Sequence, residues 1–127
     1  MKQALSLDDR GDLARLVIDI MQEWQLSPEQ QLNLLGMPED CRPRELVRLK
    51  NGSPLPEDEL ILDRARHILG IQHSLHIVFP MNQNMPKFWL KNKNRFLKGV
   101  PLYIMMGEGL DGMHRVWRHL DCTLNWE

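Results

Sequence analysis

The chain lacks the features of disulfide-bonded, membrane-spanning and secreted proteins. It has two cysteines among 127 residues, too few for a disulfide framework. No apolar run approaches the roughly 18 residues of a transmembrane helix. Residues 1–12 contain no apolar stretch of the kind that a secretory signal needs. We therefore expect a cytoplasmic protein with reduced thiols that does not associate with a membrane.

Aromatic residues are also scarce, at 6% of the chain, whereas methionine occurs eight times. Hydrophobic residues make up 43% and charged residues 26%, as in ordinary globular proteins. A chain of this length buries roughly two-thirds of its unfolded surface, which is enough for one core. We expect that core to be aliphatic and helical, and at most one further small module to share it.

The net charge of −1 conceals an uneven distribution of charge. Residues 1–40 carry three basic and eight acidic side chains, and residues 57–86 carry two basic and four acidic side chains. By contrast, residues 41–56 carry four basic side chains and one acidic side chain, and residues 87–127 carry seven basic and four acidic side chains. Such basic segments can bind phosphate groups, although most simply form a solvated face. The balance excludes a protein that is basic throughout but leaves two candidate surfaces for anionic partners.

Apolar spacing and capping residues predict an all-α fold. A first helix is expected over residues 9–24. Its inner face would carry Leu13, Leu16, Val17, Ile20, Met21 and Trp24. Ser27, Pro28 and Gln30 form a capping pattern that begins a second helix, and Gly36 ends it. A third short helix is expected to start near residues 42–43 and to run to Leu49.

Proline and glycine set the limits of the next predicted segments. A fourth helix is expected to open at residues 55–59, with Pro56 and the acidic residues in its first turn, and to end at Gly70. Its inner face would carry Leu60, Ile61, Ala65, Ile68 and Leu69. Residues 72–79 form a fifth segment, for which a helix is favoured over a strand because its neighbours are helical.

A polar, irregular stretch over residues 81–86 separates two predicted helical parts. Short helices are expected beyond it, over residues 87–90, 101–106 and 110–120, with Gly107 ending the second of them. The chain therefore divides into a part over residues 1–80 and a part over residues 81–127.

The second and third predicted helices have the spacing of a helix-turn-helix. In that motif the second helix enters the major groove of DNA and the first crosses the backbone. Four cations would contact phosphates or base edges: Arg42, Arg44, Arg48 and Lys50. The alternative is a pair of ordinary short helices with a charged, solvated face.

No residue pattern points to a metal or catalytic site. His73 and His76 are three residues apart, as are His119 and Cys122, but no further ligands complete either pair. No nucleophile lies in an activated setting, and no glycine-rich phosphate loop follows a strand. We therefore expect a protein that is not an enzyme and needs neither metal nor cofactor.

A series of spaced residues marks the last third of the chain. In order they are Trp89-Leu90, Asn94, Phe96-Leu97, Gly99, Pro101, Gly107, Gly109, Val116 and Leu120. This series resembles the toxin-binding domain of the MbcA/ParS/Xre antitoxins. Two positions depart from the family pattern. Lys93 stands where the family often has proline, and Val100 stands where it often has a small polar residue. Within the series, Asn94, Gly99 and Pro101 are expected to shape a turn rather than touch a partner.

The first half is similar to the Xre-like helix-turn-helix domain of the same antitoxins. The matching residues are Trp24, Ser27-Pro28-Glu29, Leu34-Leu35-Gly36, Arg64 and Leu69-Gly70-Ile71. The resemblance implies an Xre-like helix-turn-helix domain over residues 1–80 and a toxin-binding domain over residues 81–127. It spans most of the chain, from about Leu13 to Leu120.

The resemblance implies the antitoxin of a type II toxin–antitoxin system. Its partner would be a RES-domain toxin that degrades NAD, and the complex would repress its own operon by binding operator DNA. A homodimer is expected, because an operator-binding helix-turn-helix usually reads two half-sites. The last helix and tail would hold the toxin through Arg115, Arg118, His119 and Trp126. A basic surface there would suit an acidic rim or a phosphate-binding pocket on the toxin.

Two other functions stay open. The chain could be a stand-alone helix-turn-helix transcriptional regulator without a toxin, or a small helical adaptor without DNA binding. A toxin-like gene beside its own gene would separate the antitoxin from both. Salt-dependent binding to its own promoter would separate the regulator from the adaptor.

Overall fold

The computed structural model describes residues 5–124, with side chains through residue 122. Within these residues the chain forms seven α-helices and no strand, so the predicted all-α fold is confirmed. The helices are α1 (Leu7–Glu23), α2 (Pro28–Leu35), α3 (Arg44–Lys50), α4 (Glu59–Val78), α5 (Met85–Lys91), α6 (Pro101–Glu108) and α7 (Leu110–Leu124).

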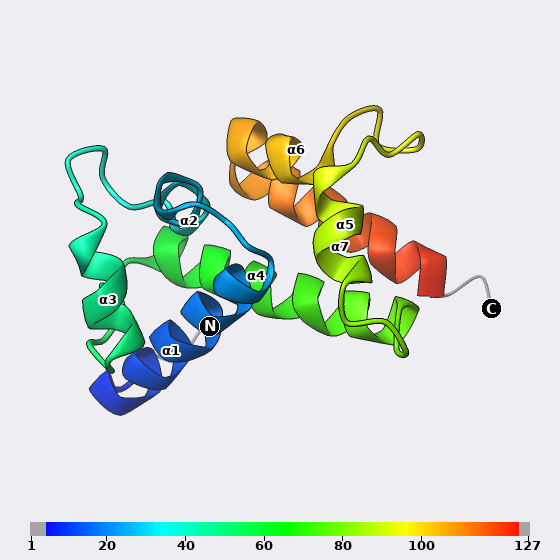
Figure 1. The fold of residues 1–127 in the computed structure, drawn as a ribbon. Coiled ribbons are helices and arrows are strands. Elements are labelled where there is room, and N and C mark those ends of the chain that lie inside the picture. The colour runs from blue at the N-terminus through cyan, green and yellow to red at the C-terminus, as the bar shows by residue number, and fades with distance from the viewer. Residues whose placement is uncertain (1–4, 125–127) are drawn as a thin grey trace.

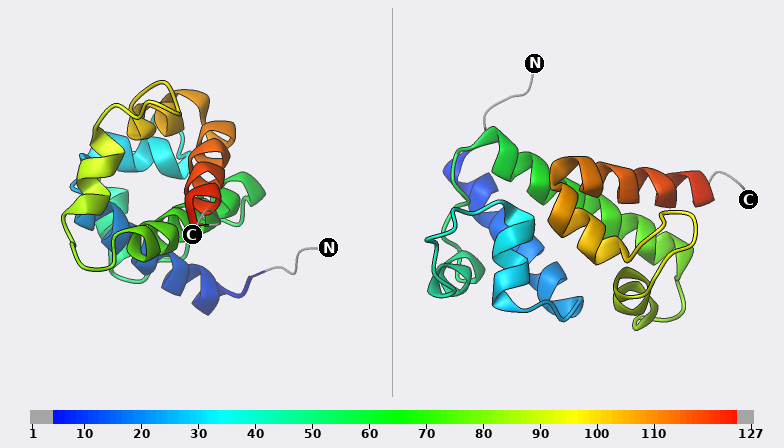
Figure 2. Two further views of the ribbon diagram at one scale, coloured as in Figure 1. Left: turned by 90° about the vertical axis from the view of Figure 1, so that its right-hand side faces the viewer. Right: turned by 90° about the horizontal axis from the view of Figure 1, so that it is seen from above.

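The 20-residue helix α4 is the element against which both halves of the chain pack. It contacts α1 and α2 from the first half and α5 and α7 from the second (Figure 1). Figure 2 shows α7 lying alongside α4. The first and last parts of the chain are therefore joined by one central helix.

The predicted end of the fourth helix at Gly70 is wrong, because α4 continues to Val78. Gly70 lies where α7 crosses α4, and a Cβ atom there would come within 2.1 Å of Trp117 Cζ2. Its lack of a side chain thus allows close helix contact. The segment over residues 72–79, interpreted as a separate element, belongs to the same helix.

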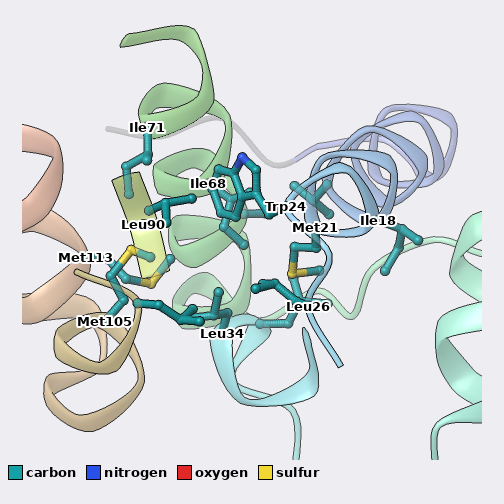
Figure 3. Packing of buried hydrophobic residues seen from close by; sticks show 14 of the residues in the cluster. Ile18, Met21, Trp24, Leu26, Leu34, Ile68, Ile71, Leu90, Met105 and Met113 are labelled. Carbon is teal, nitrogen blue, oxygen red and sulfur yellow. The ribbon is translucent and has the colours of Figure 1, made fainter. Parts of the chain in front are cut away.

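One hydrophobic core runs through both predicted parts. Buried side chains from α1, α2 and α4 to α7 meet there (Figure 3): Ile18, Met21, Trp24, Leu34, Ile68, Ile71, Leu90, Met105 and Met113. The division at residue 80 stays a prediction, and it separates segments that share this core.

The predicted limits of α2 are confirmed at both ends. Ser27 Oγ accepts a hydrogen bond from Gln30 N at 3.2 Å, and Gln30 Oε1 accepts one from Ser27 N at 2.9 Å. Gly36 follows the helix with φ of 74°, a left-handed conformation that glycine adopts readily. A capping pair at the start and a glycine at the end made the limits of this helix predictable from the sequence.

Some predicted inward positions and one predicted helix end are wrong. Leu16 and Leu60 are 52% and 63% exposed, while Ile18 and Leu62 take the buried positions nearby. Each helix has more apolar residues than its buried face can hold, so spacing alone does not choose among them. Gly107 lies inside α6, which ends one residue later.

Candidate functional site

The four cations predicted to bind DNA lie at and just before α3, and all four are exposed. Leu46 and Leu49 pack inward and orient the helix. Lys50 Nζ donates to Gln22 Oε1 of α1 at 2.7 Å. Arg48 Nη1 pairs with Glu45 Oε1 at 3.2 Å, an exposed pair of small energetic value.

Arg42 and Arg44 form no side-chain hydrogen bond or ion pair with residues 5–124. With Arg48 they line a surface groove of about 640 Å³. Cys41 also lines it, and burial, then the carboxylates of Glu45 and Asp40, raise the pKa of its thiol. The groove is therefore cationic at its arginines and contains a protonated, weakly nucleophilic thiol.

The geometry of α2 and α3 differs from the short turn that the sequence predicts. The third helix begins at Arg44, and eight residues, 36–43, separate it from α2. A helix-turn-helix commonly has a turn of about three or four residues. The main packing partner of α3 is α1. The helix-turn-helix assignment therefore stays a prediction.

The second set of predicted site residues lies on α7. Arg115 donates from Nη1 to the Glu108 carboxylate, at 2.9 and 3.1 Å, and from Nη2 to the Leu97 carbonyl at 2.5 Å. It thus ties α7 to α6 and to the preceding turn. Arg118 is exposed. Trp126, which is also predicted to contact the toxin, lies outside the described residues.

His119 belongs to a group of aromatic rings drawn from α5, α7 and the turn between α5 and α6. Its ring stacks on Trp89, with centroids 6.3 Å apart and planes at 13°, and on Phe96, at 5.9 Å and 29°. Partial burial lowers the pKa of His119, because a low-dielectric setting disfavours the imidazolium. The imidazole is therefore neutral at neutral pH.

The turn between α5 and α6 is closed by backbone pairing. Asn94 and Gly99 exchange hydrogen bonds of 2.7 and 3.3 Å, and Asn94 Oδ1 accepts one from Leu97 N at 2.9 Å. Leu97 is buried, and Pro101 starts α6. Asn94 and Gly99 therefore shape the turn as predicted, and Pro101 starts the helix that follows it. That these residues do not touch a partner stays a prediction.

Sequence reasoning missed the surface of this turn. Residues 87–98 contain five basic and no acidic side chains. Phe88 and Phe96 from the same stretch are exposed. The uninterrupted basic run with interleaved aromatics was the available signal, but the wider count over residues 87–127 concealed it.

Metal-binding and membrane-spanning features are not seen in the described part of the chain. No group of three or more His, Cys, Asp or Glu side chains there could hold a metal ion. His73 and His76 are both exposed. None of the helices described is long and apolar enough to cross a membrane.

Fold and surfaces together define a small all-helical protein with exposed cations at α3 and at the α5–α6 turn. No protein-family model matches the chain. It is 32% identical over 103 residues to an uncharacterized protein, y4oB, of Sinorhizobium fredii (strain NBRC 101917 / NGR234). The alignment covers 80% of this chain and 76% of that protein. The chain therefore belongs to the same family as y4oB.

Proposed function

We propose that the protein is the antitoxin of a type II toxin–antitoxin system, and that it binds and neutralises a RES-domain toxin that degrades NAD. It acts by protein binding rather than catalysis, and it represses its own operon as a homodimer on operator DNA. The resemblance of the last third to MbcA/ParS/Xre antitoxins supports this proposal. Of the residues in that pattern, Asn94 and Gly99 close the turn between α5 and α6, and Pro101 starts α6.

One observation carries the toxin-binding part of the proposal, namely the two-sided character of α7. Met113, Val116 and Leu120 are buried in the core. Arg118 is exposed, and His119 stacks on the exposed ring of Phe96. Arginine and aromatic side chains are enriched at protein interfaces, and the charge of Arg118 would complement an acidic rim on a partner.

The exposed arginines around α3 support the DNA-binding part. Guanidinium groups match phosphate oxygens and guanine edges in geometry. Arg42 and Arg44 have no side-chain partner in residues 5–124, so both can bind phosphate without breaking an ion pair. A stand-alone regulator would use the same surface without a toxin.

The decisive experiment expresses the reading frame adjacent to this gene, with and without this chain, and follows growth and cellular NAD. We expect growth arrest with falling NAD, and recovery of both when the chain is present. An adjacent product without toxicity, or toxicity that the chain does not relieve, would contradict the antitoxin and favour the stand-alone regulator.

Paired variants separate the two activities. Arg44→Ala with Arg48→Ala should weaken promoter binding and its salt dependence while neutralisation is kept. Arg118→Ala, Trp126→Ala or deletion of residues 122–127 should weaken toxin capture while promoter binding is kept. Equal loss of both activities in the arginine pair would show that Arg44 and Arg48 serve the fold instead.

A further inference from the structure

The turn between α5 and α6 presents a group of cations that have no ion-pair partner in the described chain. Lys93, Arg95 and Lys98 are exposed, and no salt bridge or side-chain hydrogen bond within residues 5–124 involves them. Lys91 differs, because its Nζ donates to the Gln25 carbonyl at 2.8 Å. We call the surface formed by Lys93, Arg95, Phe96 and Lys98 the cationic turn.

The cationic turn is held in one conformation by its own hydrogen bonds and by α7. Asn94 and Gly99 close it, and Arg115 Nη2 donates to the carbonyl of Leu97 at its centre. The buried Leu97 side chain anchors it to the core. Because the backbone is already fixed, a ligand would bind without a large cost of ordering the loop.

Phe96 places an exposed ring among these cations. Its side chain is 78% exposed, although it stacks on His119, which in turn stacks on Trp89. An aromatic ring supported from behind and open to solvent, with cations around it, is the arrangement that single-strand-binding proteins use. Bases stack on the ring and phosphates lie against the cations.

We propose that the cationic turn binds single-stranded nucleic acid, with an unpaired base stacked on Phe96 and backbone phosphates held by Lys93, Arg95 and Lys98. A base inside a duplex has both faces covered, so the exposed ring favours a single strand. The turn and α3 lie toward opposite ends of the molecule (Figures 1 and 2). The turn is therefore separate from α3, and the inference does not depend on operator binding. The turn adjoins the surface proposed for the toxin, because Phe96 stacks on His119.

The test measures fluorescence anisotropy of labelled oligo-dT and oligo-rU of about 12 nucleotides, and of a blunt duplex, with the full chain. We expect at least one single strand to bind more tightly than the duplex, and the two single strands to show whether DNA or RNA is preferred. Phe96→Ala should weaken single-strand binding by about tenfold, whereas Phe96→Tyr should keep it. Because Phe96 is exposed, both variants should fold, and their thermal unfolding is compared with that of the parent.

A charge variant tests the phosphate contacts. Lys93→Gln with Arg95→Gln should reduce the slope of log affinity against log salt by about 1.4, since each phosphate contact on a single strand contributes about 0.7. The matched control is Arg15→Gln with Arg66→Gln, which removes two cations on α1 and α4 that belong to neither proposed site. We expect that control to leave single-strand affinity unchanged.

Three results would overturn the proposal. The first is equal oligonucleotide affinity for Phe96→Ala and the parent. The second is loss of oligonucleotide affinity in Arg44→Ala with Arg48→Ala but not in Lys93→Gln with Arg95→Gln, which would place the strand on α3 instead. The third is loss of toxin capture by Lys93→Gln with Arg95→Gln while oligonucleotide affinity stays the same. That third result would assign the cationic turn to an acidic protein partner.

Discussion

Gly70 and Gly107 both lie inside helices but have opposite surroundings. A Cβ at position 70 would meet the Trp117 ring, whereas a Cβ at position 107 would meet nothing within 4 Å. We predict that Gly70→Ala lowers the free energy of unfolding by about 1–3 kcal/mol, because Trp117 must move out of its packed position. Urea unfolding followed by circular dichroism measures the change.

Gly107→Ala is the control for that substitution. This substitution removes only the backbone flexibility of a glycine in a helix, so we expect the free energy of unfolding to rise by about 0.5–1 kcal/mol. Equal gains for both variants would mean that Trp117 moves at no cost, which would contradict the role assigned to Gly70.

His119 gives the protein a predicted pH dependence of stability. Burial lowers its pKa in the folded chain, so the unfolded chain binds a proton at higher pH. The contribution of the buried neutral imidazole to the free energy of unfolding is fully present above the unfolded pKa of about 6.5. It is lost as the pH falls through the lower folded pKa. We predict that unfolding free energy falls more between about pH 8 and pH 5 in the parent than in His119→Gln. Urea unfolding over this range tests this, and identical pH profiles would rule it out.

At the scale of elements, Arg64 of α4 joins the C-terminal ends of α2 and α6. Its Nη1 donates to the Asn33 carbonyl at 3.3 Å. A Cβ at Gly36 would lie 2.8 Å from its Cδ and Nε, and one at Gly109 would lie 2.9 Å from its Nη2. Both positions follow helix ends, where unpaired carbonyls and the helix dipole favour a cation.

We predict that Arg64→Met lowers stability by about 1 kcal/mol, since it keeps the stem but removes the charge at both helix ends. Amide hydrogen exchange should speed up in the last turns of α2 and α6 and stay unchanged in α3. The control is Arg66→Met, because Arg66 pairs with Asp63 on its own helix. Similar exchange changes in both variants would argue against a specific role for Arg64.

The start of α2 was predictable from the sequence because capping side chains mark it, whereas helix ends were uncertain because glycine was the only sign. Gly36 and Gly70 look alike in sequence. Gly36 adopts a positive φ and ends α2, whereas Gly70 stays helical and makes room for Trp117. Which role a glycine takes depends on a helix more than 40 residues away, so local pattern does not decide it.

The candidate sites show the same limit. Exposure of the α3 cations followed from their charge and from inward-facing Leu46 and Leu49. The stacking of His119 on Trp89 and Phe96 did not, since it joins residues that are 30 and 23 positions apart. Only the packing of α5 and α7 around the core brings these rings together.

At the scale of the whole molecule, the shared core predicts one cooperative unit rather than two independent domains. Leu90, Met105 and Met113 from the second part are fully buried together with Ile68 and Ile71 of α4. A fragment of residues 81–127 would lose α4 and expose these side chains to water. Since a chain this short rarely builds an adequate core alone, we expect the fragment to lack a cooperative unfolding transition.

The full chain should unfold in a single step, with coincident transitions by circular dichroism and tryptophan fluorescence. Mixing the fragments 1–80 and 81–127 should restore helical signal, because α4 on the first fragment offers the surface that α7 needs. A cooperative transition in the isolated second fragment, or two separate transitions in the full chain, would instead establish two domains divided near residue 80. In the single-unit case, a ligand bound at the cationic turn and one bound at α3 each stabilise the same folded state, and each should raise the melting temperature of the entire chain.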